Sequence, residues 1–306
     1  MFLSESLAIG AAIAIALSAM FTAALHNRIP LFQLVRWQLS ASFVMTSIGA
    51  TLNGGWGTLG HWQILALMAS GVAGIVLAST TYFATILTVG PRLTALLFSL
   101  TSPFALFLGY LALGETIDLK QGFGIVLILI GLAVAVGLPS PHAAPDALGS
   151  DENAPKPLPV AKARPWLGIG LGVVTAIGQA LGTLLARPAM ASGVEPFAAM
   201  SVRISLAVVF FWALAALPQI RKQDAAFRVK DFSIIAASAF SGTTVGMVLL
   251  MAALKLGNVG IVSTLSSITP VVILPMVWIV SRKMPSAMAW CGAVLAVIGT
   301  AVISLN

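Results

Sequence analysis

Charged side chains are scarce in this 306-residue chain, in which Asp, Glu, Lys and Arg together make up 8% of the residues. A soluble globular domain has about 25% charged residues, so the composition excludes a water-soluble shell. Hydrophobic residues make up 59% of the chain, and its mean hydropathy is +1.03. These values predict a polytopic membrane protein.

Cysteine and histidine are nearly absent too, with one and three copies. Cys291 lies in an apolar run, which excludes a disulfide framework and a thiolate metal cluster. His26, His61 and His142 all fall in predicted loops. A membrane-embedded enzyme needs a metal-binding His pair, an intramembrane Asp dyad or a Ser/His pair, and the sequence has none of these. We therefore expect no catalytic residue, no metal site and no cofactor.

The excess of positive charge, +7 at neutral pH, does not indicate nucleic-acid binding. The 16 Lys and Arg residues are scattered over short loops, and such a distribution is typical of the signals that orient membrane proteins. We expect the lipid bilayer and a small-molecule substrate as partners, no nucleic acid, and a monomer.

Ten apolar stretches are long enough to cross a bilayer as helices. In order, they are residues 6–25, 32–52, 62–89, 94–113, 119–138, 166–186, 197–217, 232–254, 260–281 and 286–305. Residues 139–165 contain seven prolines mixed with Asp, Glu, Ser and Lys, a composition that predicts a solvated, extended linker. The chain therefore divides into residues 1–138, the linker 139–165, and residues 166–306.

The two sets of five spans have the marks of a duplication. A shift of 167 residues brings Ser99-Leu-Thr-Ser-Pro103 onto Ser266-Ser-Ile-Thr-Pro270, and Arg36 onto Arg203. Because five is odd, the second copy starts from the opposite membrane face, and the copies are inverted repeats. Secondary transporters are commonly built this way, with the substrate near the midplane between the repeats. We expect an all-α integral membrane protein with ten transmembrane helices, as two inverted five-helix repeats around a central cavity.

Several features carry a family resemblance: Pro103 in span four, the Leu113-Gly114-Glu115 that ends it, the Arg opening spans two and seven, and the Gly-rich spans five and ten. With these features the sequence resembles the EamA-type branch of the drug/metabolite transporter superfamily. The resemblance implies a basket-like bundle with a cavity lined by spans one, three, four, six, eight and nine. It also implies a bacterial inner-membrane exporter of amino acids, aromatic ones included, or related metabolites. One departure is Arg282, at the position that matches Glu115.

The polar residues predicted at depth in the membrane are neutral. All nine acids fall in or beside predicted loops, so we expect no buried carboxylate. Proton coupling through an intramembrane carboxylate is therefore disfavoured. The candidate substrate-binding residues are Ser79, Tyr82, Ser99, Ser102, Gln179, Thr183, Thr244, Ser263 and Ser266. A Ser or Thr in a membrane helix usually bonds its own backbone or a neighbouring helix, whereas buried Tyr and Gln need partners. Such a cavity suits a small amphipathic or aromatic zwitterion better than a phosphate ester.

Two arginines and two prolines are further candidates. Arg36 and Arg203 lie about a turn and a half inside their spans. Each either snorkels to the headgroups or places a charge at the cavity mouth, where it meets a substrate carboxylate. Pro103 and Pro270 interrupt spans four and nine, as packing kinks or as hinges for alternating access.

The sequence predicts a secondary transporter that exports small amphipathic metabolites by alternating access. The alternatives are a carrier of drugs or other metabolites on the same fold, and a non-transporting membrane scaffold, against which the short loops argue. Loops after odd-numbered spans carry eleven basic residues and the others three, which predicts both termini outside and residues 139–165 in the cytoplasm. The eleven are Arg28, Arg92, Lys156, Lys162, Arg164, Arg221, Lys222, Arg228, Lys230, Arg282 and Lys283, and the three are Lys120, Arg187 and Lys255.

Overall fold

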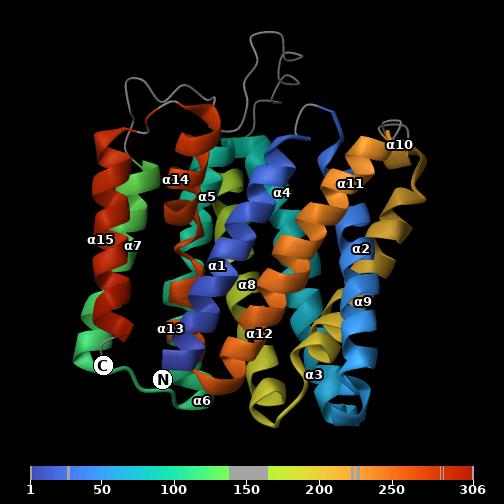
Figure 1. Cartoon of the computed structure of the whole chain (residues 1–306), viewed down its shortest axis with the longest axis horizontal. Helices are drawn as coiled ribbons and strands as arrows, with labels where there is room; N and C mark the ends of the chain where they lie inside the picture. Colours follow the sequence, from blue (N-terminus) through green and yellow to red (C-terminus); the bar gives the residue numbers. More distant parts are fainter. Residues whose placement is uncertain are drawn as a thin grey trace.

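The computed structural model describes residues 2–25, 28–137, 165–221, 224, 228–282, 284 and 286–304. Within these residues every regular element is a helix and no strand occurs. The helices stand side by side in one bundle. The start of the first helix and the end of the last helix lie at the same end of this bundle (Figure 1). The predicted linker lies outside the described residues except for Pro165, which begins a helix.

The elements follow the two predicted groups. The first group consists of α1 (Phe2–Ala23), α2 (Leu31–Leu52), η1 (Gly55–Thr58), α3 (His61–Gly71), η2 (Val72–Leu77), α4 (Ala78–Val89), α5 (Pro91–Ser99), α6 (Thr101–Leu113) and α7 (Leu119–Gly137). The second consists of α8 (Pro165–Ala191), α9 (Pro196–Ala215), α10 (Pro218–Arg221), α11 (Val229–Ser238), η4 (Ala239–Gly246), α12 (Met247–Leu256), α13 (Val259–Ser266), α14 (Thr269–Ser281) and α15 (Ala287–Ser304). Here η1 is a 3₁₀-helix, while η2 and η4 are π-helical segments.

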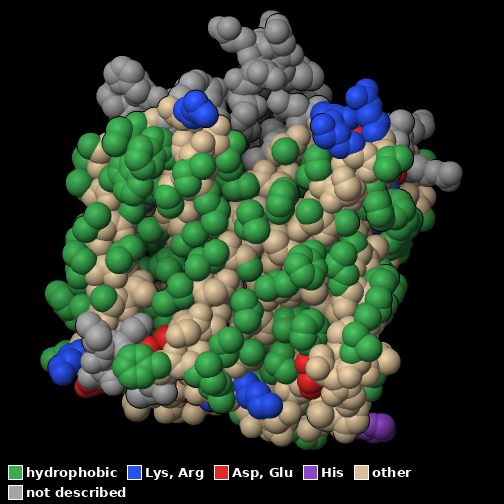
Figure 2. Space-filling view, in the orientation of Figure 1, with side chains coloured by type: hydrophobic (Ala, Val, Ile, Leu, Met, Phe, Trp, Pro, Cys, Tyr) green, Lys and Arg blue, Asp and Glu red, His purple; other side chains and the backbone are tan. Residues whose placement is uncertain are grey.

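Seven stretches of the described chain have the length and apolar composition of membrane spans. They are Phe2–Thr22, His61–Val89, Leu93–Leu113, Trp166–Ala191, Pro196–Ala215, Val229–Leu256 and Val259–Val280, and two shorter apolar helices are Leu119–Val134 and Ala287–Ile303. On the face shown in Figure 2, hydrophobic side chains cover the middle of the bundle and Lys and Arg gather towards its two ends. This surface fits a bilayer.

The two groups repeat the same backbone irregularities about 167 residues apart. The π-helical segment η2 interrupts the third predicted span, and η4 interrupts the eighth. Likewise Leu100 separates α5 from α6, while Ser267 and Ile268 separate α13 from α14. These paired irregularities support the duplication inferred from the sequence.

The second of these breaks holds one residue more than the first, and this corrects the alignment beyond it. Gly114 ends α6 with a left-handed φ of 64°, and Arg282 ends α14 with a left-handed φ of 54°. Arg282 therefore occupies the place of Gly114 and not of Glu115. An arginine in this conformation is strained relative to glycine, so the second repeat has a costlier helix end than the first.

Close contact between the two groups depends on glycine. A Cβ added at Gly182 in α8 would lie 2.5 Å from the Cα of Gly74 in η2. The two backbones therefore touch, which only a glycine pair permits. This contact packs η2 and the neighbouring α4 directly against α8.

Among the described residues, three ion pairs link the two groups near the bundle ends. Arg28 pairs with Asp231 at 3.0 Å, Arg36 with Asp224 at 2.7 Å, and Arg187 with Glu115 at 3.7 Å.

The expectation that no carboxylate is buried is wrong. Asp231 is 2% exposed at the start of α11, and Glu5 is 4% exposed. Glu5 lies inside a helix because α1 begins at Phe2, before the predicted start of the first span. Its Oε2 has no hydrogen-bond partner among the described residues.

Candidate substrate site

The two interrupted spans meet inside the bundle. Ser102, at the start of α6, donates a hydrogen bond to the hydroxyl of Ser267 at 3.1 Å, which joins the break of one group to the break of the other. Pro103 and Pro270 lie in the first turn of α6 and α14, where proline is tolerated because no intrahelical N–H bond is lost.

Side chains satisfy the backbone at these breaks. Thr269 donates from Oγ1 to the carbonyl of Ser266 at 2.9 Å, and Thr101 donates to that of Phe98 at 2.7 Å. A break inside a membrane needs such partners, because lipid supplies none. The helices can therefore bend here without leaving a carbonyl unpaired.

Several predicted substrate residues already use their hydroxyl groups within the protein. Ser99, Thr183 and Ser266 donate to backbone carbonyls of their own helices, those of Leu96, Ala180 and Ser263 respectively. Thr244 bonds the hydroxyl of Ser42 at 2.9 Å, and Ser102 bonds Ser267 as above. Three of these five side chains therefore stabilise their own helix, and the other two connect neighbouring helices.

Four other predicted residues keep free hydrogen-bonding capacity. The side chains of Ser79, Tyr82 and Gln179 make no hydrogen bond to any described residue. The Oγ of Ser263 is buried and unpartnered, with the residue 4% exposed. In an apolar bundle such groups are costly unless a ligand or water satisfies them.

Tyr82 and Gln179 come from helices in direct contact. Thr175 of α8 donates a hydrogen bond to Thr81 of α4 at 2.7 Å; Tyr82 follows Thr81 directly, and Gln179 lies one turn beyond Thr175. The Tyr82 ring packs edge-on against Phe98 at 5.6 Å and Phe83 at 6.1 Å. The rings of Phe83 and Phe98, here called the aromatic wall, therefore lie next to Tyr82 at this contact.

Arg36 is neither snorkelling nor free. Its Nη2 lies 2.7 Å from Oδ2 of Asp224, and its guanidinium stacks 4.8 Å above the Trp212 ring. These residues line a pocket of about 310 Å³ together with Ala215 and Ala216. The sequence did not identify Asp224 as the partner, because it lies 188 residues away in a loop.

Arg203 lies deeper than a cavity mouth. It is the eighth residue of α9, so at 1.5 Å per residue it is about 10 Å from the helix start. It is 2% exposed and makes no ion pair with any described acid. Its Nη1 donates to Sδ of Met251 at 3.3 Å, and its Nε has no partner among the described residues.

A polar cluster that sequence reasoning missed joins α1, α2 and α11. Ser18 and Ser238 share a hydrogen bond of 2.8 Å, Thr22 reaches Ser238 at 3.0 Å, and Gln38 donates to both serines. The only sequence signal was a glutamine inside an apolar span. Because its members bond one another, we interpret the cluster as a connection between helices.

Glu115 makes a second set of contacts that the sequence did not predict. Its Oε2 accepts the backbone N–H of Val259 at the start of α13, at 2.8 Å, with Arg187 at 3.7 Å from Oε1. Glu115 lies in the loop after α6, where desolvation raises its pKa above the ordinary 4.5, opposed by the Val259 N–H and by Arg187. The carboxylate thus ties the end of one interrupted span to the start of the other.

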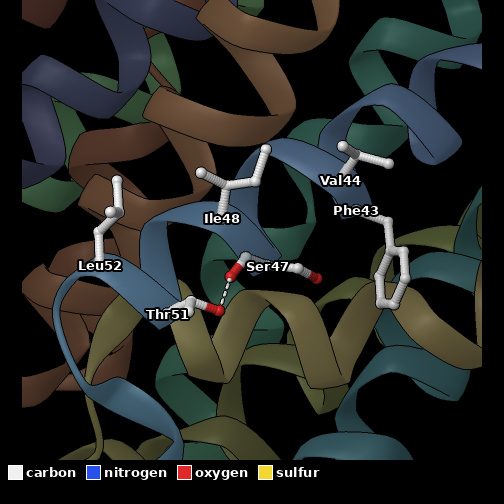
Figure 3. A pocket seen from close by; sticks show the side chains of 6 residues that line it. All are labelled: Phe43, Val44, Ser47, Ile48, Thr51 and Leu52. Carbon is white, nitrogen blue, oxygen red and sulfur yellow. Dashed lines mark hydrogen bonds between the residues drawn. The ribbon is translucent and has the colours of Figure 1, made fainter.

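A second pocket, of about 380 Å³, is a groove on the outer face of α2. It is lined by Phe43, Val44, Ser47, Ile48, Thr51 and Leu52. In Figure 3 these side chains follow one stripe of the helix, and Thr51 bonds back to the Ser47 carbonyl. Val44, Ile48 and Leu52 are more than half exposed, so the groove faces the position of lipid chains. Neither pocket contains any of the nine predicted substrate residues.

The described residues thus form two groups of helices that are interrupted at matching places and joined across their breaks, an arrangement typical of membrane transporters. The chain belongs to the EamA-like transporter family, whose model matches residues 3–137 and 166–305. Its members are membrane transporters of the drug/metabolite type and not enzymes, so this chain is a multi-pass membrane transporter. The two matched blocks leave out the predicted linker.

One solved structure, described only as a crystal structure of a protein, is similar to the chain with a TM-score of 0.75. The similarity covers 97% of this chain and 95% of that one at 16% sequence identity, which supports the fold alone. No curated protein sequence matches the chain.

Proposed function

We propose that this protein is a secondary transporter that exports small amphipathic metabolites, aromatic and other amino acids among them. The observation that best supports this proposal is the free hydrogen-bonding capacity of four side chains inside an apolar bundle, those of Ser79, Tyr82, Gln179 and Ser263. A solute with an amino group, a carboxylate and an apolar side chain satisfies these groups and packs against the aromatic wall of Phe83 and Phe98.

Transport proceeds by alternating access between two inverted repeats of five spans each, residues 1–138 and 166–306. The paired breaks at Leu100 and at Ser267–Ile268 support this proposal, because they give each repeat a bending point at the same depth. The ion pairs that cross between the repeats are contacts that form and break as the repeats rock. In a bacterium the protein lies in the inner membrane.

The test is efflux from proteoliposomes. Purified protein is reconstituted and loaded in turn with each radiolabelled amino acid and with a panel of cationic drugs, and release is compared with that from protein-free liposomes. We expect protein-dependent release of one or more amino acids, with competition among them. Release of drugs alone would assign the chain to the multidrug alternative, and release of nothing would contradict transport of these solutes.

A further inference from the structure

The buried guanidinium of Arg203 lacks the partner that its pseudo-symmetric counterpart has. Arg36 is neutralised by Asp224 and stacks on Trp212. Arg203 is equally buried, yet its described contacts include no carboxylate, and the only hydrogen bond that its side chain makes is to the thioether of Met251. A thioether is a weak acceptor, so the positive charge is almost uncompensated.

Such an arrangement is costly in a membrane. Removing a cation from water without an anionic partner costs several kcal/mol, and charged groups inside membrane proteins are rare and usually functional. The Nε–H of the same guanidinium is a further hydrogen-bond donor, and it has no partner among the described residues. Arg203 therefore has both the charge and the hydrogen-bonding capacity to bind an anion.

The neighbours of Arg203 point to the same conclusion. A methyl group added at Gly74 would lie 3.2 Å from Nη2 of Arg203 and 3.7 Å from Oε1 of Gln179. The ends of both polar side chains thus flank one glycine, from α9 and α8. That glycine belongs to the π-helical segment η2, and π-helical segments occur frequently at functional sites.

We propose that Arg203 and Gln179 form a subsite that binds the carboxylate of the transported solute. Arg203 supplies the charge and a planar pair of donors. The Nε2 of the Gln179 amide donates a further hydrogen bond to the carboxylate, since Oε1, the atom that lies towards Gly74, is an acceptor. This proposal rests on the proposed function and names the group by which the solute is recognised. Because Arg203 is 2% exposed, the solute reaches it when η2 separates from α8.

The single charge limits the class of anion. Among the described residues Arg36 and Arg187 also lie inside long helices, but each is already paired with an acid, Asp224 and Glu115 respectively. A phosphate monoester carries nearly two negative charges and needs several cations or donors. One guanidinium beside one amide matches a monoanionic carboxylate.

The experiment compares acids with their esters. The melting temperature of the purified protein is measured with each of the twenty amino acids and with each methyl ester, which keeps the amine and side chain but removes the negative charge. Arg203→Met, Arg203→Lys and the wild type are compared, with Arg282→Met as the control for loss of an arginine that is exposed and lies beyond the end of α14.

We expect the wild type and Arg282→Met to be stabilised by acids at concentrations about 10- to 100-fold lower than by their esters. Arg203→Met should lose this preference, and Arg203→Lys should keep part of it. Without solute, Arg203→Met should melt no lower than the wild type, because it removes an uncompensated charge.

Each remaining outcome decides between the two proposals. An acid preference that survives in Arg203→Met, or esters that stabilise the wild type as well as acids do, would overturn the subsite while leaving transport intact. A lower melting temperature of Arg203→Met with an unchanged preference would assign Arg203 to packing. No stabilisation and no flux with any solute would remove the proposed function itself.

Discussion

Tyr82 and Gln179 carry hydrogen-bonding groups that no described neighbour uses, although they lie on two helices in contact. The hydroxyl of Thr46, by contrast, is fully buried and donates to the Ser42 carbonyl of its own helix at 2.8 Å. If a solute binds as proposed, the free groups of Tyr82 and Gln179 gain a hydrogen-bond partner, whereas the Thr46 hydroxyl already has one. The difference defines a mutational test.

Tyr82→Phe and Gln179→Ala should weaken apparent affinity roughly 5- to 100-fold, because losing a hydrogen bond to a buried partner costs on the order of 1–3 kcal/mol. Thr46→Val is the control, and its affinity should stay within about twofold of the wild type because it removes a local backbone bond. Competition assays in proteoliposomes give the affinities. Wild-type affinity in both test variants would assign these side chains to helix packing.

Glu115 should make stability depend on pH. Since desolvation raises its pKa above 4.5, the folded protein holds the proton more tightly than the unfolded chain does. This contribution to stability is therefore full below pH 4.5 and is lost as the pH rises through the raised pKa. The melting temperature of the wild type should fall relative to Glu115→Gln over that interval, because glutamine keeps an acceptor for Val259 without titrating. A constant difference across the interval would show that Glu115 does not titrate there.

At this scale the sequence predicted the residue types of the candidate site but not their bonding. Ser79 and Ser99 look alike in sequence, yet Ser99 bonds its own helix and Ser79 does not. The choice depends on rotamers and on neighbours far away in the chain. The same reason hid the Gln38 cluster, whose partner Ser238 is 200 residues away.

At the scale of elements, the two helix breaks are the parts that we expect to bend. Leu100, Ser267 and Ile268 have ψ values of −11°, −6° and 0°, away from the α-helical value of about −42°. The amides of all three bond three residues back, as in a 3₁₀ turn. A short tightened turn before a proline can change its dihedral angles without disturbing the helices on either side.

Pro270→Ala should therefore slow transport more than it changes stability. Alanine restores an N–H that can bond the Ser266 carbonyl and extend α13 into α14, which stiffens the break. Pro270 lies in the first turn of α14, so we expect less than about 1 kcal/mol of change in unfolding free energy. Flux at saturating solute and thermal unfolding should be measured side by side. Unchanged flux would show that the proline shapes packing and is not part of a hinge.

The sequence placed the helices well because apolar runs between turn residues define them. It did not reveal η2 and η4, since a π-helical segment differs from an α-helix by a single hydrogen-bond shift and leaves the apolar pattern intact. The one sign was the length of the third predicted span, residues 62–89, which exceeds the roughly 20 residues that a helix needs to cross a bilayer. Its irregularity proved to lie in the middle, where Gly74 meets Gly182.

At the scale of the whole molecule, the ion pairs show how the halves are joined. Each pair takes its acid and its base from different halves, Arg28 and Arg36 with acids of the second and Glu115 with Arg187. These side chains are largely buried, so the cost of removing them from water offsets much of the attraction within each pair. If the halves move against each other as proposed, the position of these pairs near the bundle ends favours a role in selecting one arrangement over another.

Orientation in the membrane is the last property that the whole chain determines. The outer ends of α1 and α15 lie at one end of the bundle (Figure 1), so both termini face the same side. The loops after odd-numbered spans, which the sequence predicts on the side opposite to the termini, carry eleven of the fourteen loop Lys and Arg residues. Lys and Arg are retained in the cytoplasm. We therefore expect both termini outside and residues 139–165 inside. Ser150→Cys and Asn306→Cys, each in a Cys291→Ala background, should be treated with a membrane-impermeant thiol reagent on intact cells. Position 306 should react and position 150 should react only after permeabilisation; the reverse pattern would show that the basic loops face outward.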